Sequence, residues 1–349
     1  MSRTYADYSH PWWRRLVVSR EAAMLALLVG LVVWAVGNVV YFGTSLTLTY
    51  LLLDTAPVLL IALPMTMVIV TGEIDLSVAS VVGLSSVLLG DLTRSGVPIG
   101  FAALLALLAG LACGALNGYL VAYVGLPSLA VTIGTLALFR GLAIGLLGTT
   151  AVTDFPKDWT SVATSEVGGT GIPLITVPFL VLAGAFALLL HFSPFGRGVY
   201  DIGLSKEAAI FSGVDVRRTV FVLFLLTGVV SAFAGLYFTL RFGSARGDNA
   251  TGLELQVIAA VLLGGVSIFG GRGRLLGVVL GVLLIGTISS ALRLLGVTVN
   301  VINIIIGALL IVSVMSTSVL AWLPGLTRRK SPGTSPQKTS SGVGSQERV

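Results

Sequence analysis

The side chains of this 349-residue chain that could take part in chemistry are few, and several stand within or beside long apolar runs. Five of them carry a carboxylate or an amide: Asp54, Glu73, Asp75, Asn117 and Glu254. A charge at the middle of a bilayer costs at least roughly 2.5–3.5 kcal/mol, so such groups face either protein or water. Together with Ser77, they are candidates for the lining of a water-filled path for a polar solute.

The segment from Thr71 to Ser77 offers a second interpretation for two of these candidates. It has the pattern of a polar break before a helix, and either Asp75 or Ser77 can accept backbone N–H groups of the first turn. For Asp75, capping and path lining both remain open. A similar Thr-Gly pair precedes Glu254, which fits two inverted halves of five spans each. A chance match of two small residues explains this repeated Thr-Gly pair equally well.

Covalent, redox and metal chemistry have no visible basis in the sequence. Cys113 is the only cysteine, which excludes an intrachain disulfide and a thiolate metal site. His10 and His191 stand far apart without flanking ligands, and no P-loop of the form Gly-x-x-x-x-Gly-Lys-Ser/Thr occurs. We expect neither an enzyme nor a metal centre, and no nucleotide hydrolysis of the P-loop kind in this chain.

The apolar composition identifies the elements that must position these residues. Hydrophobic residues make up 55% of the chain and charged residues 10%, and the mean hydropathy is +1.00. Continuous rather than alternating apolar runs favour helices over a barrel, so we expect an all-α polytopic membrane protein. About ten runs approach the ~20 residues of a crossing: 21–42, 46–70, 74–92, 98–120, 127–148, 172–192, 219–240, 252–269, 275–293 and 297–319. Pro57 and Pro64 could kink or split the second of these runs, 46–70.

Glycines four residues apart mark three helix faces suited to close packing, at 110–118, 141–145 and 273–281. Small residues let helix backbones approach and gain dispersion contacts in lipid. We interpret these faces as contacts within one subunit, while a dimer seam remains open for one of them.

The distribution of charge predicts the orientation of the chain. With both termini in the cytoplasm, basic residues concentrate on the cytoplasmic side, as the positive-inside rule requires. The net charge of +6 therefore fits lipid as the surrounding partner and does not indicate nucleic acid. We expect a cytoplasmic N-terminal segment at 1–20, a transmembrane domain at 21–323 and a disordered cytoplasmic tail at 324–349.

A polar segment at 193–218 divides the hydrophobic chain and is predicted to be a cytoplasmic coupling loop. It is either a solvated loop or the site of a short helix from Ser205 to Gly213 that lies across the membrane face. Ser205 can cap such a helix, Glu207 suits its first turn and Gly213 can end it. The candidate residues for contact with a separate motor subunit are Lys206, Glu207, Ala208, Ala209, Phe211 and Gly213.

Several linked motifs resemble the permease subunits of ribose-type ATP-binding cassette (ABC) sugar importers over roughly residues 20–320. They are Thr71-Gly72-Glu73-Ile74-Asp75-Leu76-Ser77-Val78, Asn117-Gly118 with Leu126-Pro127-Ser128 and Thr132-Ile133-Gly134-Thr135, Phe195-Gly196-Arg197 with Glu207-Ala208-Ala209 and Ser212-Gly213-Val214, and residues 258–273. Within this family, residues 62–70 and 242–246 are most similar to D-type permeases of autoinducer-2 import systems. Rhamnose permeases are nearly as similar.

The resemblance implies a permease of the bacterial inner membrane that pairs with itself or with a second permease. Cytoplasmic ATPases would bind ATP and Mg²⁺, so this chain would need no cofactor, and an extracytoplasmic binding protein would deliver the solute. The implied solute is carbohydrate-like, of the autoinducer-2, rhamnose or ribose type. By resemblance, Glu207-Ala208-Ala209 belongs to the region that couples the permease to its ATPase.

Two positions depart from the pattern of the family. Glu73 stands where the family usually has glycine, which places an extra carboxylate near the expected path and bears on the identity of the solute. Leu204-Ser205-Lys206 stands where the family usually has Gly-Asn, which bears on the detailed contact with the ATPase.

Two other functions are consistent with the sequence. A secondary transporter driven by an ion gradient could use the membrane carboxylates Asp54, Glu73, Asp75 and Glu254 as ion sites. A branched-chain amino-acid permease of the same superfamily differs from the sugar permeases only in its solute.

Overall fold

The computed structural model describes residues 20–327, so residues 1–19 and most of the expected tail lie outside the described residues. Every regular element in this part is a helix, and two isolated bridges pair single loop residues. The expected all-α fold is therefore confirmed. The helices are α2 (Arg20–Asn38), α3 (Ser45–Val70), α4 (Val78–Arg94), α5 (Ile99–Ala122), α6 (Ser128–Leu147), α7 (Lys157–Thr164), α8 (Thr176–Phe192), α9 (Pro194–Leu204), α10 (Lys206–Phe211), α11 (Val216–Phe242), α12 (Leu253–Leu263), α13 (Leu275–Leu294) and α14 (Val299–Thr327).

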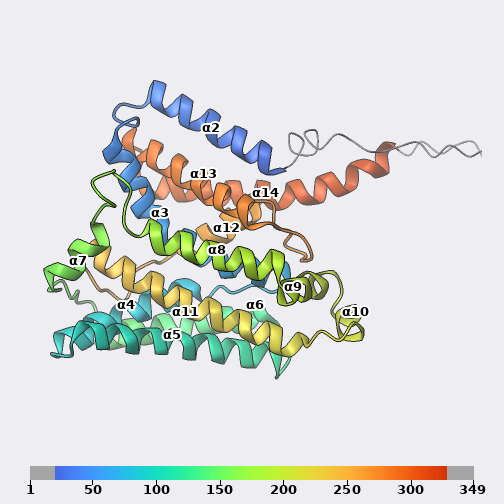
Figure 1. The fold of residues 1–349 in the computed structure, drawn as a ribbon, viewed down its shortest axis with the longest axis horizontal. Helices are drawn as coiled ribbons and strands as arrows, with labels where there is room; N and C mark the ends of the chain where they lie inside the picture. Colours follow the sequence, from blue (N-terminus) through green and yellow to red (C-terminus); the bar gives the residue numbers. More distant parts are fainter. Residues whose placement is uncertain (1–19, 328–349) are drawn as a thin grey trace, which may run out of the picture.

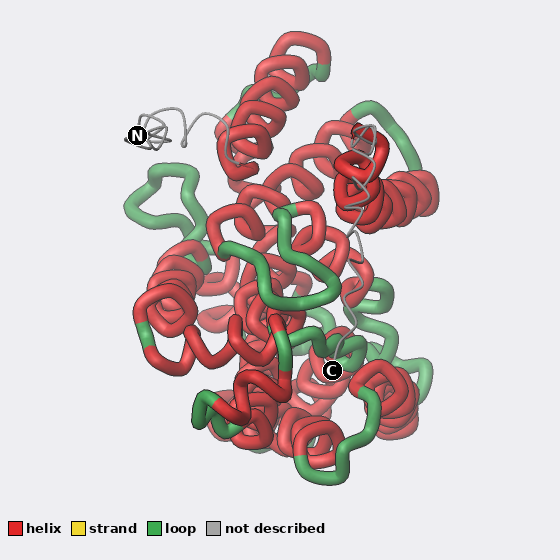
Figure 2. The backbone as a smooth tube through the Cα atoms, turned by 90° about the vertical axis from the view of Figure 1, so that its right-hand side faces the viewer, coloured by secondary structure: helices red, strands yellow, loops and turns green. Residues whose placement is uncertain are grey.

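The long helices run side by side along the longest axis of the molecule (Figure 1). Helices α9 and α10 lie at one end of this bundle and α7 lies toward the other. The start of α2 and the last turns of α14 point toward the end that carries α10. Figure 2 views the molecule from this end, where many helices are seen along their axes and green loops connect them.

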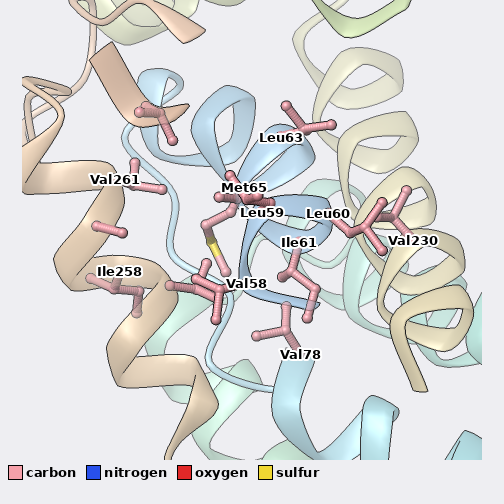
Figure 3. Close-up of a cluster of buried hydrophobic side chains, with 14 of the residues drawn as sticks. Val58, Leu59, Leu60, Ile61, Leu63, Met65, Val78, Val230, Ile258 and Val261 are labelled. Atoms are coloured by element: carbon pink, nitrogen blue, oxygen red, sulfur yellow. The ribbon is translucent and has the colours of Figure 1, made fainter. Parts of the chain in front are cut away.

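Helix α3 forms the centre of the bundle. Almost all of its residues from Thr55 onward are buried, and it packs against α8, α11, α12 and α13. Figure 3 shows its side chains between Val230 of α11 and Ile258 and Val261 of α12. The helix continues through Pro57, which cannot donate to the carbonyl of Leu53. The hydroxyl of Tyr237 on α11 donates to that carbonyl instead, at 3.0 Å, so the proline does not split the helix.

Each of the ten predicted spans contains a helix, but fewer than ten of these helices, over their described residues, are long and apolar enough to cross a membrane. Residues 252–269 do not form one crossing, because α12 has 11 residues and is about 16 Å long, against a hydrocarbon core of ~30 Å. The chain turns at Gly264, which packs against α13, and at Gly265, which has φ of +91°. Of the described helices, six are long and apolar enough to cross a membrane, or seven if α8 and α9 form one broken span.

The polar segment at 193–218 contains two helices, although its sequence pattern predicts only one. The chain bends by 66° between α8 and α9, and α10 follows directly. The Ser193 hydroxyl accepts a hydrogen bond from the Gly196 amide at 3.0 Å, and Pro194 occupies the first turn of α9. These two start signals made α9 predictable in principle.

Two of the three glycine faces pack within the subunit. Gly114 of α5 leaves room for the backbone of Phe224 on α11, and Gly281 of α13 does so for Ala260 on α12. The third face, with Gly141 and Gly145 on α6, has no described atom within 4 Å of an added Cβ. The intrasubunit interpretation is therefore confirmed for the first two faces.

Candidate functional site

Helix α10 carries the candidate coupling residues and has the boundaries that its sequence predicts. The Ser205 hydroxyl accepts a hydrogen bond from the Ala208 amide at 3.2 Å and donates one to the Glu207 carboxylate at 3.0 Å. Gly213 follows the helix with φ of +82°, a conformation that a side chain would strain. The short helix predicted between Ser205 and Gly213 is confirmed, with its cap and its end.

Most side chains of α10 face away from the rest of the subunit. Of the candidate coupling residues only Ala209 is buried, whereas Phe211 is 92% exposed. The neighbouring Ile210 is also exposed. The backbone amide of Glu207 and then the Ser205 hydroxyl lower the pKa of the Glu207 carboxyl, so the helix presents a stable negative charge beside an exposed aromatic ring.

An ion pair connects α10 to the segment between α3 and α4. The Lys206 ammonium donates to the Glu73 carboxylate at 2.5 Å. The Lys206 side chain is 51% exposed, whereas that of Glu73 is 10% exposed. The structure therefore joins a candidate coupling residue to a candidate path residue. These are also positions at which the sequence departs from the pattern of the resembled family.

The segment between α3 and α4, residues 71–77, is held by the start of α6. The Ser128 hydroxyl accepts a hydrogen bond from the Ile74 amide at 3.2 Å, and the Thr132 hydroxyl donates to the Ile74 carbonyl at 3.2 Å. The Glu73 amide donates to the carbonyl of Val68 on α3, also at 3.2 Å. This non-helical segment is thus fixed by neighbours on both sides.

The three candidate path residues Asp75, Ser77 and Asn117 form one buried chain of hydrogen bonds. Asn117 Nδ2 donates to the Ser77 hydroxyl at 2.8 Å, and that hydroxyl donates to Asp75 Oδ1 at 2.7 Å. The same carboxylate oxygen accepts the Ser77 amide at 2.9 Å. Each of the three residues is at most 2% exposed. This geometry supports the capping interpretation of Asp75, and the Ser77 side chain caps nothing itself.

Backbone contacts hold several elements together at the end of the bundle that carries α10. The Gly271 amide donates to the carbonyl of Val70 at the end of α3, at 2.8 Å. Gly203 of α9 lies so close to both groups that an added Cβ would collide with them. The Tyr200 hydroxyl of α9 donates to the Gly273 carbonyl at 2.7 Å. Helix α9, the loop between α12 and α13, and the end of α3 therefore form one closely packed junction beside α10.

A second polar site surrounds Asp54, toward the opposite end of α3. The Asp54 carboxylate pairs with Arg293 of α13 at 3.1 Å and with Arg241 of α11 at 3.4 Å. It lines two adjoining cavities of about 110 and 630 Å³. Asp54 is about 24 Å along the helix from Val70, at 1.5 Å per residue. Further polar side chains of these cavities are Ser244, Arg246, Asp248, Asn249, Thr251, Gln256, Ser289 and Asn303.

Arg140 on α6 ties the loop before α12 to the start of α4. Its guanidinium donates to the carbonyls of Gly247 and Asn249 at 2.7 Å each and to that of Ala79 at 3.1 Å. The half-buried Glu254 follows in the first turn of α12. From the sequence alone, Arg140 was assigned no role. An arginine inside an apolar run indicates a buried polar partner, so this signal was available.

The structure separates the candidate path residues into three places. Glu73 lies beside α10, and the chain of Asp75, Ser77 and Asn117 is enclosed by protein. Asp54 lines an open cavity, near the start of the helix that carries Glu254. Sequence reasoning missed the two arginines that pair with Asp54, because their partner is 187 or more residues away in the chain.

A family model described as "Branched-chain amino acid transport system / permease component" matches residues 47–314. This range covers both polar sites, α10 and all the helices between them. The family expected from the sequence motifs is therefore confirmed.

Curated relatives match over most of their length. The "Autoinducer 2 import system permease protein LsrD" of Escherichia coli (strain K12), and the proteins of the same name from Shigella flexneri and Escherichia coli O157:H7, are each 40% identical over 312 residues. The match covers 86% of this chain and 92% of each relative. No solved structure matches the chain. A matching family model and relatives of this identity and coverage establish that the chain belongs to this family and is a multi-pass membrane permease of an ABC importer.

Proposed function

We propose that the chain imports a carbohydrate-like solute of the autoinducer-2 type across the bacterial inner membrane. The observation that carries this proposal is its 40% identity, over 86% of the chain, with permeases named for autoinducer-2 import. The motifs that resemble ribose-type and rhamnose permeases support the same class of solute.

The cavities around Asp54 are proposed as the part of the path that the solute enters. Polar side chains on apolar helices do not face lipid, so they must face water or a partner. The side chains of Gln256, Ser289 and Asn303 line these cavities without a hydrogen bond to other described residues. Amide, hydroxyl and carboxylate groups offer the paired donors and acceptors that a solute with several hydroxyl groups requires. Glu254 at the start of α12 would act at the edge of this path.

Helix α10 is proposed to dock onto a cytoplasmic ABC ATPase. Its exposed Phe211 offers an apolar anchor, and the charged Glu207 next to it offers a partner for a basic group. ATP and Mg²⁺ would bind to the ATPase and not to this chain. The end of the bundle with α10 and both described termini would then face the cytoplasm. A solute-binding protein would dock at the opposite end, near the Asp54 cavities.

A branched-chain amino acid is the second candidate solute, favoured by the description of the family model. Asp54 and Arg293 stand side by side and could pair with the ammonium and carboxylate groups of an amino acid. Val58, Ile285 and Ile302 line the smaller cavity and could receive its apolar side chain.

Uptake by the complete importer tests the proposal. The chain, its partner permease, the ATPases and the binding protein would be reconstituted in proteoliposomes. We expect ATP-dependent uptake of autoinducer-2, weaker competition by rhamnose and ribose, and no uptake of leucine. Uptake of leucine without uptake of any of these carbohydrates would show that the solute is an amino acid. Gradient-driven uptake by this chain without the ATPases would overturn the proposed coupling.

A further inference from the structure

We propose that Glu73 and Lys206 are positioning residues whose ion pair transmits movement of α10 to the segment 71–77 and from there toward the Asp54 cavities. This inference rests on the proposed function, because it takes α10 as the helix that the ATPase moves. It assigns Glu73 a role in coupling rather than in contact with the solute.

The two side chains are placed for such a role. Lys206 is the first residue of α10, and Glu73 lies in the non-helical segment between α3 and α4, 133 positions earlier in the chain. In the described part of the chain, no other side chain of α10 forms an ion pair outside this helix. The Glu73 carboxylate is nearly buried, and a buried carboxylate without its partner is costly. The pair therefore resists separation when α10 moves.

Movement of Glu73 reaches the start of α4 through the backbone. Ile74 follows directly and is held by Ser128 and Thr132 of α6. Asp75 then accepts the Ser77 amide, one residue before α4 begins. A shift of this short segment must therefore move the first turn of α4 relative to α6 or break these bonds.

The first turn of α4 is connected in turn to the cavity lining. Ala79 in this turn accepts a hydrogen bond from Arg140, whose guanidinium also holds the carbonyl of Asn249. Asn249 lines the larger cavity beside Asp54. The Lys206–Glu73 ion pair, the backbone of residues 73–79 and the hydrogen bonds of Arg140 thus connect α10 to the proposed solute site. The backbone junction of Gly203 with Val70 and Gly271 holds α9, but it does not include α10.

The test compares four forms of the complete importer: wild type, Glu73→Lys, the exchanged pair Glu73→Lys/Lys206→Glu, and the neutral pair Glu73→Gln/Lys206→Met. The neutral pair leaves no buried charge without a partner, so this variant should fold. It can therefore be compared with wild type even if Glu73→Lys does not fold. The matched control exchanges the exposed pair Asp91 and Arg94, which lies away from α10. The readouts are co-purification of the ATPases, ATP hydrolysis, and solute taken up per ATP hydrolysed.

We expect the neutral pair to take up roughly tenfold less solute per ATP hydrolysed, whatever amount of ATPase it binds, in the usual range of coupling between two sites. The exchanged pair should restore most of this ratio, and the Asp91–Arg94 control should leave it unchanged. A neutral pair with wild-type uptake per ATP would overturn the inference, as would an exchanged pair as uncoupled as the neutral pair. Wild-type protein that does not co-purify with the ATPases would instead overturn the proposed function.

Discussion

The amide of Gly271 donates a hydrogen bond to the carbonyl of Val70, and Gly203 lies against both residues. An added Cβ at Gly203 would collide with these backbone groups, which cannot rotate away as a side chain can. We expect Gly203→Ala to lower the free energy of unfolding by about 1–3 kcal/mol, the usual cost of overpacking. The measurement is Tm of the purified protein in detergent.

The control for this prediction is Gly184→Ala on α8, where no described atom lies within 4 Å of the added Cβ. Alanine forms helices better than glycine, so Tm should stay the same or rise slightly. Equal losses of Tm for both variants would show that the junction at Gly203 is not specially tight.

Asp54→Asn removes the charge that pairs with Arg241 and Arg293. We expect uptake to fall roughly tenfold, because the arginines and the solute lose a shared hydrogen-bonding partner. Stability should fall as well, because the Arg241 side chain is only 14% exposed and loses a charged partner. Uptake kinetics over a range of solute concentrations check this result. Asp91→Asn, which removes a carboxylate from an exposed pair with Arg94, should transport normally. Full activity of Asp54→Asn would remove Asp54 from the path.

Arg140→Lys keeps the charge but loses the planar fork that reaches three carbonyls. Lysine presents a single ammonium group, so it cannot reproduce the bonds to Gly247, Asn249 and Ala79 together. We expect a loss of about 2 kcal/mol in the free energy of unfolding and faster proteolysis within residues 243–252. Arg94→Lys provides the exposed comparison and should have no effect. Wild-type resistance to protease in Arg140→Lys would contradict the proposed role.

Phe211→Asp tests the docking surface of α10. The Phe211 side chain is almost fully exposed, so its replacement should leave Tm unchanged while the ATPases no longer co-purify. Phe192→Ala, at an exposed aromatic residue of α8, should retain the ATPases. Retention of the ATPases and normal uptake in Phe211→Asp would end the docking hypothesis for this residue.

Ser205→Ala should change the pH dependence of docking through Glu207. The Ser205 hydroxyl contributes to the lowered pKa of this carboxyl, so its removal raises that pKa toward its usual value. A lowered pKa keeps the carboxylate charged as the pH falls, so the variant should lose the ATPase at a higher pH than wild type. Binding of the ATPase below about pH 5 measures this shift, because the usual pKa of a glutamate carboxyl, ~4.3, is the upper limit for the variant. Ser205→Thr keeps the hydroxyl and should behave as wild type. Identical profiles for all three proteins would exclude a role for the Glu207 charge.

The membrane helices and α10 could be predicted from the sequence because their sequence signals are local. Hydropathy over some twenty residues marks a span whatever its neighbours are. Ser205 and Gly213 define α10 through bonds and dihedral angles within a few residues of the chain. The family followed from motifs that are likewise continuous in the sequence.

Hydropathy failed where tertiary contacts end a helix within an apolar run. The residues after Leu263 are apolar enough to continue a span, but Gly264 packs on the backbone of α13 and the chain turns there. The same limit applies to the path residues. Asp75 and Asp54 both looked like charges in a membrane, yet one is enclosed in a hydrogen-bonded chain and the other lines a cavity.

By itself, the sequence determined the membrane class, the helical fold, the cap and end of α10 and the family, since these depend on composition and on neighbours in the chain. Only the tertiary structure decided that Lys206 pairs with Glu73 and that Arg241 and Arg293 pair with Asp54. An ion pair between residues more than a hundred positions apart depends on how the helices between them pack. A charged residue shows in a sequence that it needs a partner, but the fold selects which one.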